Sequence, residues 1–171
     1  VMVDGVITSS IHYDANHFYP DGAQCTSTAA AQINSGPKVP TLTCTDNAAS
    51  RFDFVWLPPQ GWDGGQIRVR LDAEDQNASP SGVLDFDFSC QCRSDADVIN
   101  STYGTAQNTS ITFATQYKLE QSTTAAITCD GTCAPGDTVF VKAVMDNTAT
   151  TVGTIANVRI LGARLDYLLA R

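Results

Sequence analysis

Apolar and polar side chains alternate with a period of two residues through most of the chain after residue 50. Phe52, Phe54 and Trp56 are each separated by one intervening residue. The same alternation recurs in segments 67–73, 84–92, 111–117, 139–145 and 161–167. Successive side chains of a strand point to opposite faces, so this pattern predicts antiparallel strands with one buried face and one wet face.

Turn residues separate these segments. Pro58-Pro59 ends one predicted strand, because proline cannot donate to a ladder, and Gly64-Gly65 indicates a tight turn. The 171 residues suffice for one hydrophobic core. We therefore expect an all-β fold, an antiparallel jelly-roll β-sandwich of about eight strands, in a single domain over residues 21–171. The expected inner faces carry Phe54, Trp56, Val69, Leu71, Phe86, Phe88, Phe113, Val141 and Leu165.

The chain contains six cysteines, an even number that favours disulfides and an oxidising compartment over a zinc site. Pairing of Cys25 with Cys44 is preferred, since it closes a loop of about 20 residues worth about 3 kcal/mol. Two arrangements stay open for the rest. Cys129 and Cys133 close a small loop, or they pair with Cys90 and Cys92 at a strand end.

Charge excludes two classes of partner. The formal net charge is -8, and only 16% of residues are charged. Such a chain repels nucleic-acid phosphates and lacks the basic cluster that binds an anionic membrane. No apolar run is long enough to span a bilayer, and the lack of an export signal in the sequence does not exclude secretion. With the cysteines, this predicts an extracellular or virion-surface protein.

Residues 1–20 are expected to be extended. They are rich in β-branched and aromatic side chains and show no helical period. One interpretation is the first strand of the same domain. The other is an N-terminal arm or donor strand that pairs with a neighbouring subunit. The assembly residues would then be Val3, Val6, Ile7, Ile11 and Tyr13.

Catalytic and cofactor motifs are not found. There is no H-E-x-x-H and no Gly-x-Ser-x-Gly elbow, and His12 and His17 would lie on opposite faces of a strand. Asp85 and Asp87 share one face of a predicted strand, which leaves a glycosidase as a third hypothesis. We expect no enzyme, no cofactor and no metal.

A loop calcium site is a weaker alternative. Its oxygen ligands would come from Asp72, Glu74, Asp75, Asp95 and Asp97, although the EF-hand signature is missing. Three N-x-S/T sequons make Asn77, Asn100 and Asn108 candidates for glycosylation.

Carbohydrate binding is the main alternative to a structural role. Trp56, Trp62 and Tyr103 are the aromatic side chains that could stack on sugar rings. The competing interpretation places Trp56 in the core, in register with Phe52 and Phe54, and Trp62 over the end of the sandwich.

Several turn and strand-end motifs resemble a family of uncharacterised single-domain jelly-roll proteins from phage and environmental sequences. These motifs are Leu57–Pro59 with Gly61–Gly65, Gln91–Arg93, Ala134–Thr138 and Ile160–Tyr167, with Ser35–Lys38 upstream. The resemblance covers about two-thirds of the chain and implies a structural role in virions or extracellular fibres.

These observations lead to one functional prediction. We expect a structural subunit that assembles with itself into an extracellular filament or virion appendage, a helical homo-polymer joined by N-terminal strand exchange. The alternative is a carbohydrate-binding module with glycans as partners.

Overall fold

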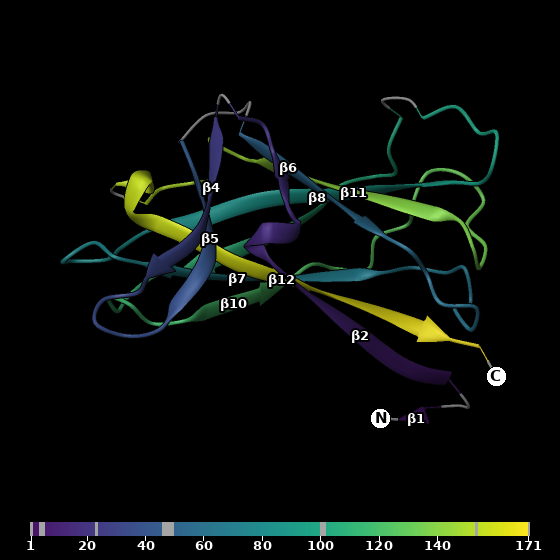
Figure 1. Ribbon diagram of the computed structural model, residues 1–171, viewed down its shortest axis with the longest axis horizontal. Coiled ribbons are helices and arrows are strands. Elements are labelled where there is room, and N and C mark those ends of the chain that lie inside the picture. Colours follow the sequence, from purple (N-terminus) through teal and green to yellow (C-terminus); the bar gives the residue numbers. More distant parts are fainter. Residues whose placement is uncertain are drawn as a thin grey trace.

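The computed structural model describes residues 2–3, 6–22, 24–45, 50–99, 102–152 and 154–170, without the side chains of Met2, Val3, Val6, Ile7 and Ala156. These residues form two packed antiparallel β-sheets (Figure 1). The strands are β1 (Met2–Val3), β2 (Val6–Asp14), β3 (Tyr19–Pro20), β4 (Cys25–Gln32), β5 (Lys38–Cys44), β6 (Arg51–Trp56), β7 (Arg68–Asp75), β8 (Val83–Arg93), β9 (Gln107–Thr112), β10 (Glu120–Thr123), β11 (Thr138–Met145) and β12 (Val158–Leu169). Two short 3-10 turns are η1 (Ala15–His17) and η2 (Ile155–Asn157).

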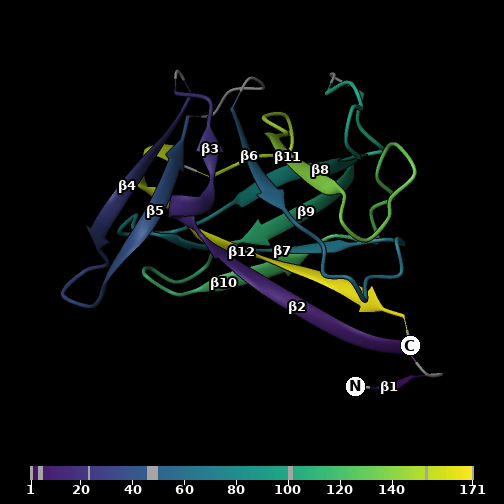
Figure 2. The same ribbon diagram turned by 45° about the vertical axis from the view of Figure 1, so that its right-hand side comes forward.

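The seven-stranded sheet has β12 at its centre. Its order is β1-β2-β12-β5-β4, and β12 also pairs with β7, which pairs with β10. The five-stranded sheet has the order β3-β6-β11-β8-β9. The predicted antiparallel jelly-roll sandwich is confirmed. The sequence underestimated the strands because β4 and β5 form a hairpin at one end of the sandwich (Figure 2), where β4 is exposed on both faces and shows no alternation.

The core lies where the two inner faces meet. All nine side chains expected on the inner faces are buried. Aromatic rings connect strands across this core: the ring centroids of Phe52 and Phe86 lie 5.4 Å apart, and those of Tyr13 and Phe54 lie 5.0 Å apart. Such contacts supply most of the packing energy of a small sandwich.

Three disulfides hold loops against the sheets. Cys25–Cys44 joins β4 to β5, the pairing that the sequence favoured. Cys90–Cys129 and Cys92–Cys133 attach the 129–133 loop to the end of β8, the second of the two arrangements left open. Cys90 and Cys92 share the inward face of one strand, so the two bridges lie side by side.

The N-terminal strand is part of its own chain's sheet. β2 pairs with β12 over eight residue pairs, from Asp14 opposite Gly162 to Ile7 opposite Leu169. Tyr13 is buried beneath this pairing, whereas Ile11, on the same face of the strand, is 39% exposed. The side chains of Val3, Val6 and Ile7 lie outside the described residues. The prediction that this strand is exchanged between neighbouring subunits is therefore wrong, because its hydrogen-bonding partner is already β12.

No helix among the described residues is long and apolar enough to cross a bilayer.

Deletion of residues 1–14 tests the role of β2. We expect it to lower the free energy of unfolding by roughly 5 kcal/mol or more, because the ladder to β12 and the buried Tyr13 are both lost. Thermal unfolding followed by circular dichroism measures the change. Deletion of residues 1–3 is the matched control and should have little effect. An unchanged Tm in the longer deletion would contradict this role.

Replacement of both Cys25 and Cys44 by alanine tests the hairpin disulfide. The expected loss is about 3 kcal/mol, from the loop entropy that the bridge removes from the unfolded chain. Urea unfolding of oxidised protein measures it. A loss below about 0.5 kcal/mol would mean that the β4–β5 hairpin is stable without its bridge.

Candidate functional site

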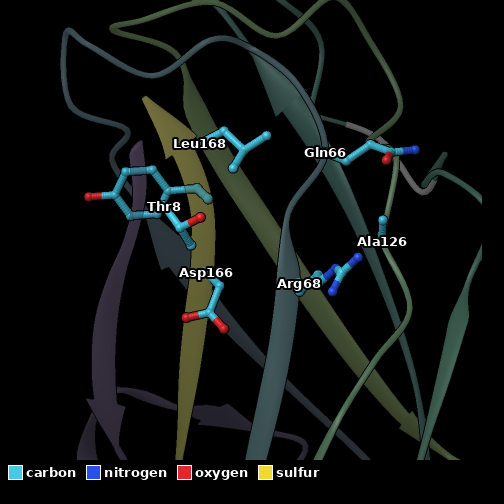
Figure 3. Close-up of a pocket in the computed structure, with 7 residues that line it drawn as sticks. Thr8, Gln66, Arg68, Ala126, Asp166 and Leu168 are labelled. Carbon is cyan, nitrogen blue, oxygen red and sulfur yellow. The ribbon is translucent and has the colours of Figure 1, made fainter. Parts of the chain in front are cut away.

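The outer face of the seven-stranded sheet carries a groove of about 310 Å³. It lies beside β2, β12 and the start of β7, with Ala126 on a further segment beyond β7 (Figure 3). We call it the outer groove. Its lining residues are Thr8, Gln66, Arg68, Ala126, Asp166, Tyr167 and Leu168. The volume lies at the lower end of the range of about 300–1,000 Å³ typical of small-molecule sites.

Strand register brings the groove's side chains together. Asp166 on β12 lies opposite Ser10 on β2 and opposite Arg68 on β7. Leu168 lies opposite Thr8. Leu165 is buried, so the alternation of the strand turns Asp166 outward.

The far wall of the groove is fixed by hydrogen bonds. Ile67 and Ile127 exchange two backbone hydrogen bonds, of 3.1 and 2.8 Å, which hold the neighbouring Ala126 in place. The Gln66 amide donates to the Thr128 hydroxyl at 3.0 Å, which leaves its carbonyl oxygen as an acceptor. The wall is therefore ordered before any ligand arrives.

Two charged side chains line the groove, and among the described residues Asp166 has a partner of opposite charge whereas Arg68 does not. Asp166 is neutralised by Arg164, whose Nη2 lies 2.8 Å from its Oδ2. The Arg68 side chain is exposed and makes no ion pair or hydrogen bond within the described part of the chain. In Figure 3 its guanidinium lies toward Ala126, away from Asp166.

Tyr167 closes the end of the groove nearest the core. Its ring centroid lies 4.8 Å from that of Trp56. Burial raises the pKa of the adjacent Tyr13 to about 12, and Tyr167 adds to this rise. The Tyr13 phenol is therefore a neutral hydrogen-bonding group at physiological pH.

The aromatic residues singled out in the sequence do not form a sugar platform. Trp56 is 1% exposed and Trp62 is 2% exposed, with ring centroids 4.9 Å apart. Both are core residues. Tyr103 has Lys142 over its ring, with Nζ 4.1 Å from the centroid. The expectation that Trp56 and Trp62 stack on sugar rings is wrong, because the sandwich covers them.

The two glycosidase candidates have structural partners. Asp85 is buried, and its carboxylate accepts hydrogen bonds from Asn108 and Ser110. Asp87 accepts from Asn108 at 3.3 Å. Neither lines the outer groove. Both oxygens of Asp85 are therefore hydrogen-bonded on the face of the five-stranded sheet.

The acids weighed for calcium do not converge. Asp72 is paired with Arg70 at 2.9 Å, and Asp97 accepts from the backbone of Ser94. Among the described residues, none of these acids belongs to a group of three side chains close enough to share an ion.

Glu74 differs from the acids described above in its hydrogen bonding. It is 1% exposed, and neither carboxylate oxygen has a hydrogen-bond partner among the described residues. Arg159 lies 4.0 Å away. Burial raises the pKa of Glu74, and the nearby Gln76 and Arg159 offset part of the rise.

A second hollow, of about 570 Å³, lies where Arg93 meets the disulfide-bonded loops. Arg93 donates to the carbonyl oxygens of Cys92, Val98 and Thr102 and pairs with Asp130 at 2.8 Å. Because the guanidinium already donates to three backbone carbonyl groups and one carboxylate, it holds the loops together and has few N–H groups left to bind a ligand.

Two of the three sequons lie in the described structure. Asn77 hydrogen-bonds to Asp75 at 2.7 Å and is half-buried, whereas Asn108 is exposed on β9 and donates to Asp85 and Asp87. Asn100 lies outside the described residues. Glycosylation at these positions stays a prediction.

Comparison with known proteins bears on the fold. No protein-family model and no curated protein matches the chain. A structure of the CBM22-1–GH10 modules of endo-1,4-β-D-xylanase 10B from Clostridium thermocellum, complexed with xylohexaose, aligns with a TM-score of 0.52 and 10% identity. The alignment covers 95% of this chain and 28% of that one, so this chain spans about a quarter of the larger protein.

A family 35 carbohydrate-binding module from Clostridium thermocellum aligns with a TM-score of 0.49 and 9% identity, over 92% of this chain and 97% of its own. At such low identity the likeness concerns the fold alone. The prediction of a filament or virion-appendage subunit is wrong. The fold aligns with a structure that contains a carbohydrate-binding module, and the strand that would join subunits is paired within its own sheet.

Sequence reasoning missed the outer groove. Thr8, Gln66, Arg68, Asp166 and Leu168 come from three separate segments, and only the register of β2, β12 and β7 brings them together. A signal did exist for Arg68, because it is the arginine whose same-face neighbour two residues on is another arginine, Arg70.

Replacement of Glu74 by glutamine tests the buried carboxylate. The pKa of the Glu74 carboxyl group is higher in the folded protein than its ordinary value of 4.5. The free energy of unfolding therefore falls as the pH rises through the raised pKa. We expect the variant to be more stable at pH 7 by roughly 1 kcal/mol, with the gain lost below pH 4.

Thermal unfolding between pH 3.5 and 8 measures this effect. Glu120→Gln is the control, since that carboxylate is paired with Lys118 at 2.8 Å and is partly exposed. A lower Tm of Glu74→Gln at pH 7 would show instead that the Glu74–Arg159 pair stabilises the fold.

Proposed function

We propose that this chain is a carbohydrate-binding module that acts by binding and not by catalysis. The observation that carries the proposal is the outer groove, a concave site on a jelly-roll sandwich lined by an amide, a guanidinium, a carboxylate, a hydroxyl, a phenol and two apolar side chains. The fold is one that the xylohexaose-complexed structure of the CBM22-1–GH10 modules also contains.

The lining matches the chemistry of a sugar ring. A pyranose presents vicinal hydroxyls that both donate and accept, and it presents C–H faces that prefer apolar contact. Gln66, Arg68 and Asp166 offer planar polar groups for the hydroxyls, while Ala126 and Leu168 offer apolar surface. The groove has room for a short saccharide, which a longer chain would enter by one end or one segment.

The same lining argues against hydrolysis. A glycosidase of the usual kind needs two carboxyl groups about 5–10 Å apart across the scissile bond. The outer groove has one, Asp166, and it is held by Arg164. Its neutralised charge suits orientation of a hydroxyl better than proton transfer.

We place the module outside the cell. Its three disulfides form and persist in an oxidising compartment, and no described cysteine is free. A polysaccharide ligand would be met there.

A blocking variant tests the groove. Ala126→Trp fills it without touching the core, and we expect at least a tenfold loss of affinity for any saccharide that the native protein binds. Affinity electrophoresis through polysaccharide gels identifies a ligand, and isothermal titration calorimetry measures the loss. Ala30→Trp, on the exposed face of β4, is the matched control and should bind normally.

Two outcomes would overturn the proposal. Undiminished binding by Ala126→Trp would move the site elsewhere on the molecule. Lack of retention of the native protein by every polysaccharide tested would remove carbohydrate binding itself.

A further inference from the structure

Arg68 stands out in the charge pattern of the chain. Acidic residues outnumber lysine and arginine by 18 to 10. Among the described residues, every other arginine has a carboxylate within 4.0 Å. In so acidic a chain, an arginine without a carboxylate is the unusual case.

The pairing follows a simple rule on the strands. Arg51–Asp53, Arg70–Asp72 and Arg164–Asp166 are all separated by two residues, so both members lie on one face. Arg68 is followed two residues later by Arg70, whose guanidinium is taken by Asp72. The local sequence therefore leaves Arg68 without a partner of its own.

Its cross-strand neighbour does not supply one. Asp166 lies opposite Arg68 in the ladder but is bound by Arg164 at 2.8 Å, and the Arg68 guanidinium points toward Ala126 and away from Asp166 (Figure 3). The groove has no further acidic or basic side chain among its lining residues. The groove therefore has a local excess of one positive charge.

We infer that the saccharide bound in the outer groove carries a carboxylate, as a uronic acid does, and that Arg68 binds it. This rests on the proposed function. A guanidinium presents two parallel N–H donors that match a carboxylate, and charge-assisted bonds of this kind are about twice as strong as neutral ones. The net charge of -8 repels polyanions elsewhere on the surface, so such binding requires a specific site.

The test compares matched ligands. Polygalacturonate, alginate and glucuronoxylan are each offered beside their carboxyl-reduced forms, which keep the polymer and lose the charge. We expect the native protein to bind at least one acidic polymer roughly tenfold or more tightly than its reduced form. Arg68→Ala should lose this preference, and Arg68→Lys should recover part of it.

Lys38→Ala is the charge control. Lys38 is exposed on β5, far along the chain from the groove, and its removal changes the net charge by the same amount. We expect Lys38→Ala to bind as the native protein does. An equal loss in both variants would indicate long-range electrostatics and overturn a specific role for Arg68.

The remaining outcomes separate the two proposals. Equal affinity for acidic and reduced polymers, lost in Ala126→Trp, would keep the groove as a saccharide site and overturn the carboxylate inference. Equal retention on dextran sulfate would also overturn it, since a sulfate ester would then serve as well. Failure to bind any of these polymers, or any neutral one, would remove the proposed function together with the inference.

Discussion

The position of β12 between two neighbouring strands is the constraint on which the rest depends. Along its length it pairs with β5 at Ile160, with β2 from Gly162 onward, and with β7 on the other side. Gly162 marks the change of neighbour, at a shift in register. A Cβ there would lie 2.5 Å from the carbonyl oxygen of Tyr13, so only glycine lets β2 approach. The outer groove exists because this approach succeeds.

Sequence alternation predicted the core well and the surface poorly. Strands with one buried face, such as β6 and β11, alternate strictly in burial and were recognised for that reason. β4 is exposed on both faces, so its sequence shows no alternation of apolar and polar residues. Trp56 and Trp62 illustrate the same limit at the site. Residue type suggested sugar stacking, but only packing shows that their rings cover one another in the core.

The groove could not be predicted from residue spacing, because its side chains converge through register and not through sequence proximity. Asp166 and Arg68 are almost a hundred positions apart and become neighbours only when β12 and β7 align. The disulfides were partly accessible. Cys25 and Cys44 flank a short hairpin, whereas the pairing of Cys90 and Cys92 with Cys129 and Cys133 depends on how a distant loop returns to the end of β8.

The acidic chain balances its charge locally on the outer faces of several strands. Pairs of arginine and aspartate two residues apart neutralise the outer faces of β6, β7 and β12 locally, which keeps these faces polar without concentrating charge of one sign. A surface so balanced offers little to a ligand that recognises charge. The proposed specificity for an acidic saccharide depends on the position where the pairing rule is broken, and the register of β7 with β12 sets that position inside the groove. At Arg68 the sequence pattern of arginine–aspartate pairs is interrupted, and the fold places this residue in the outer groove.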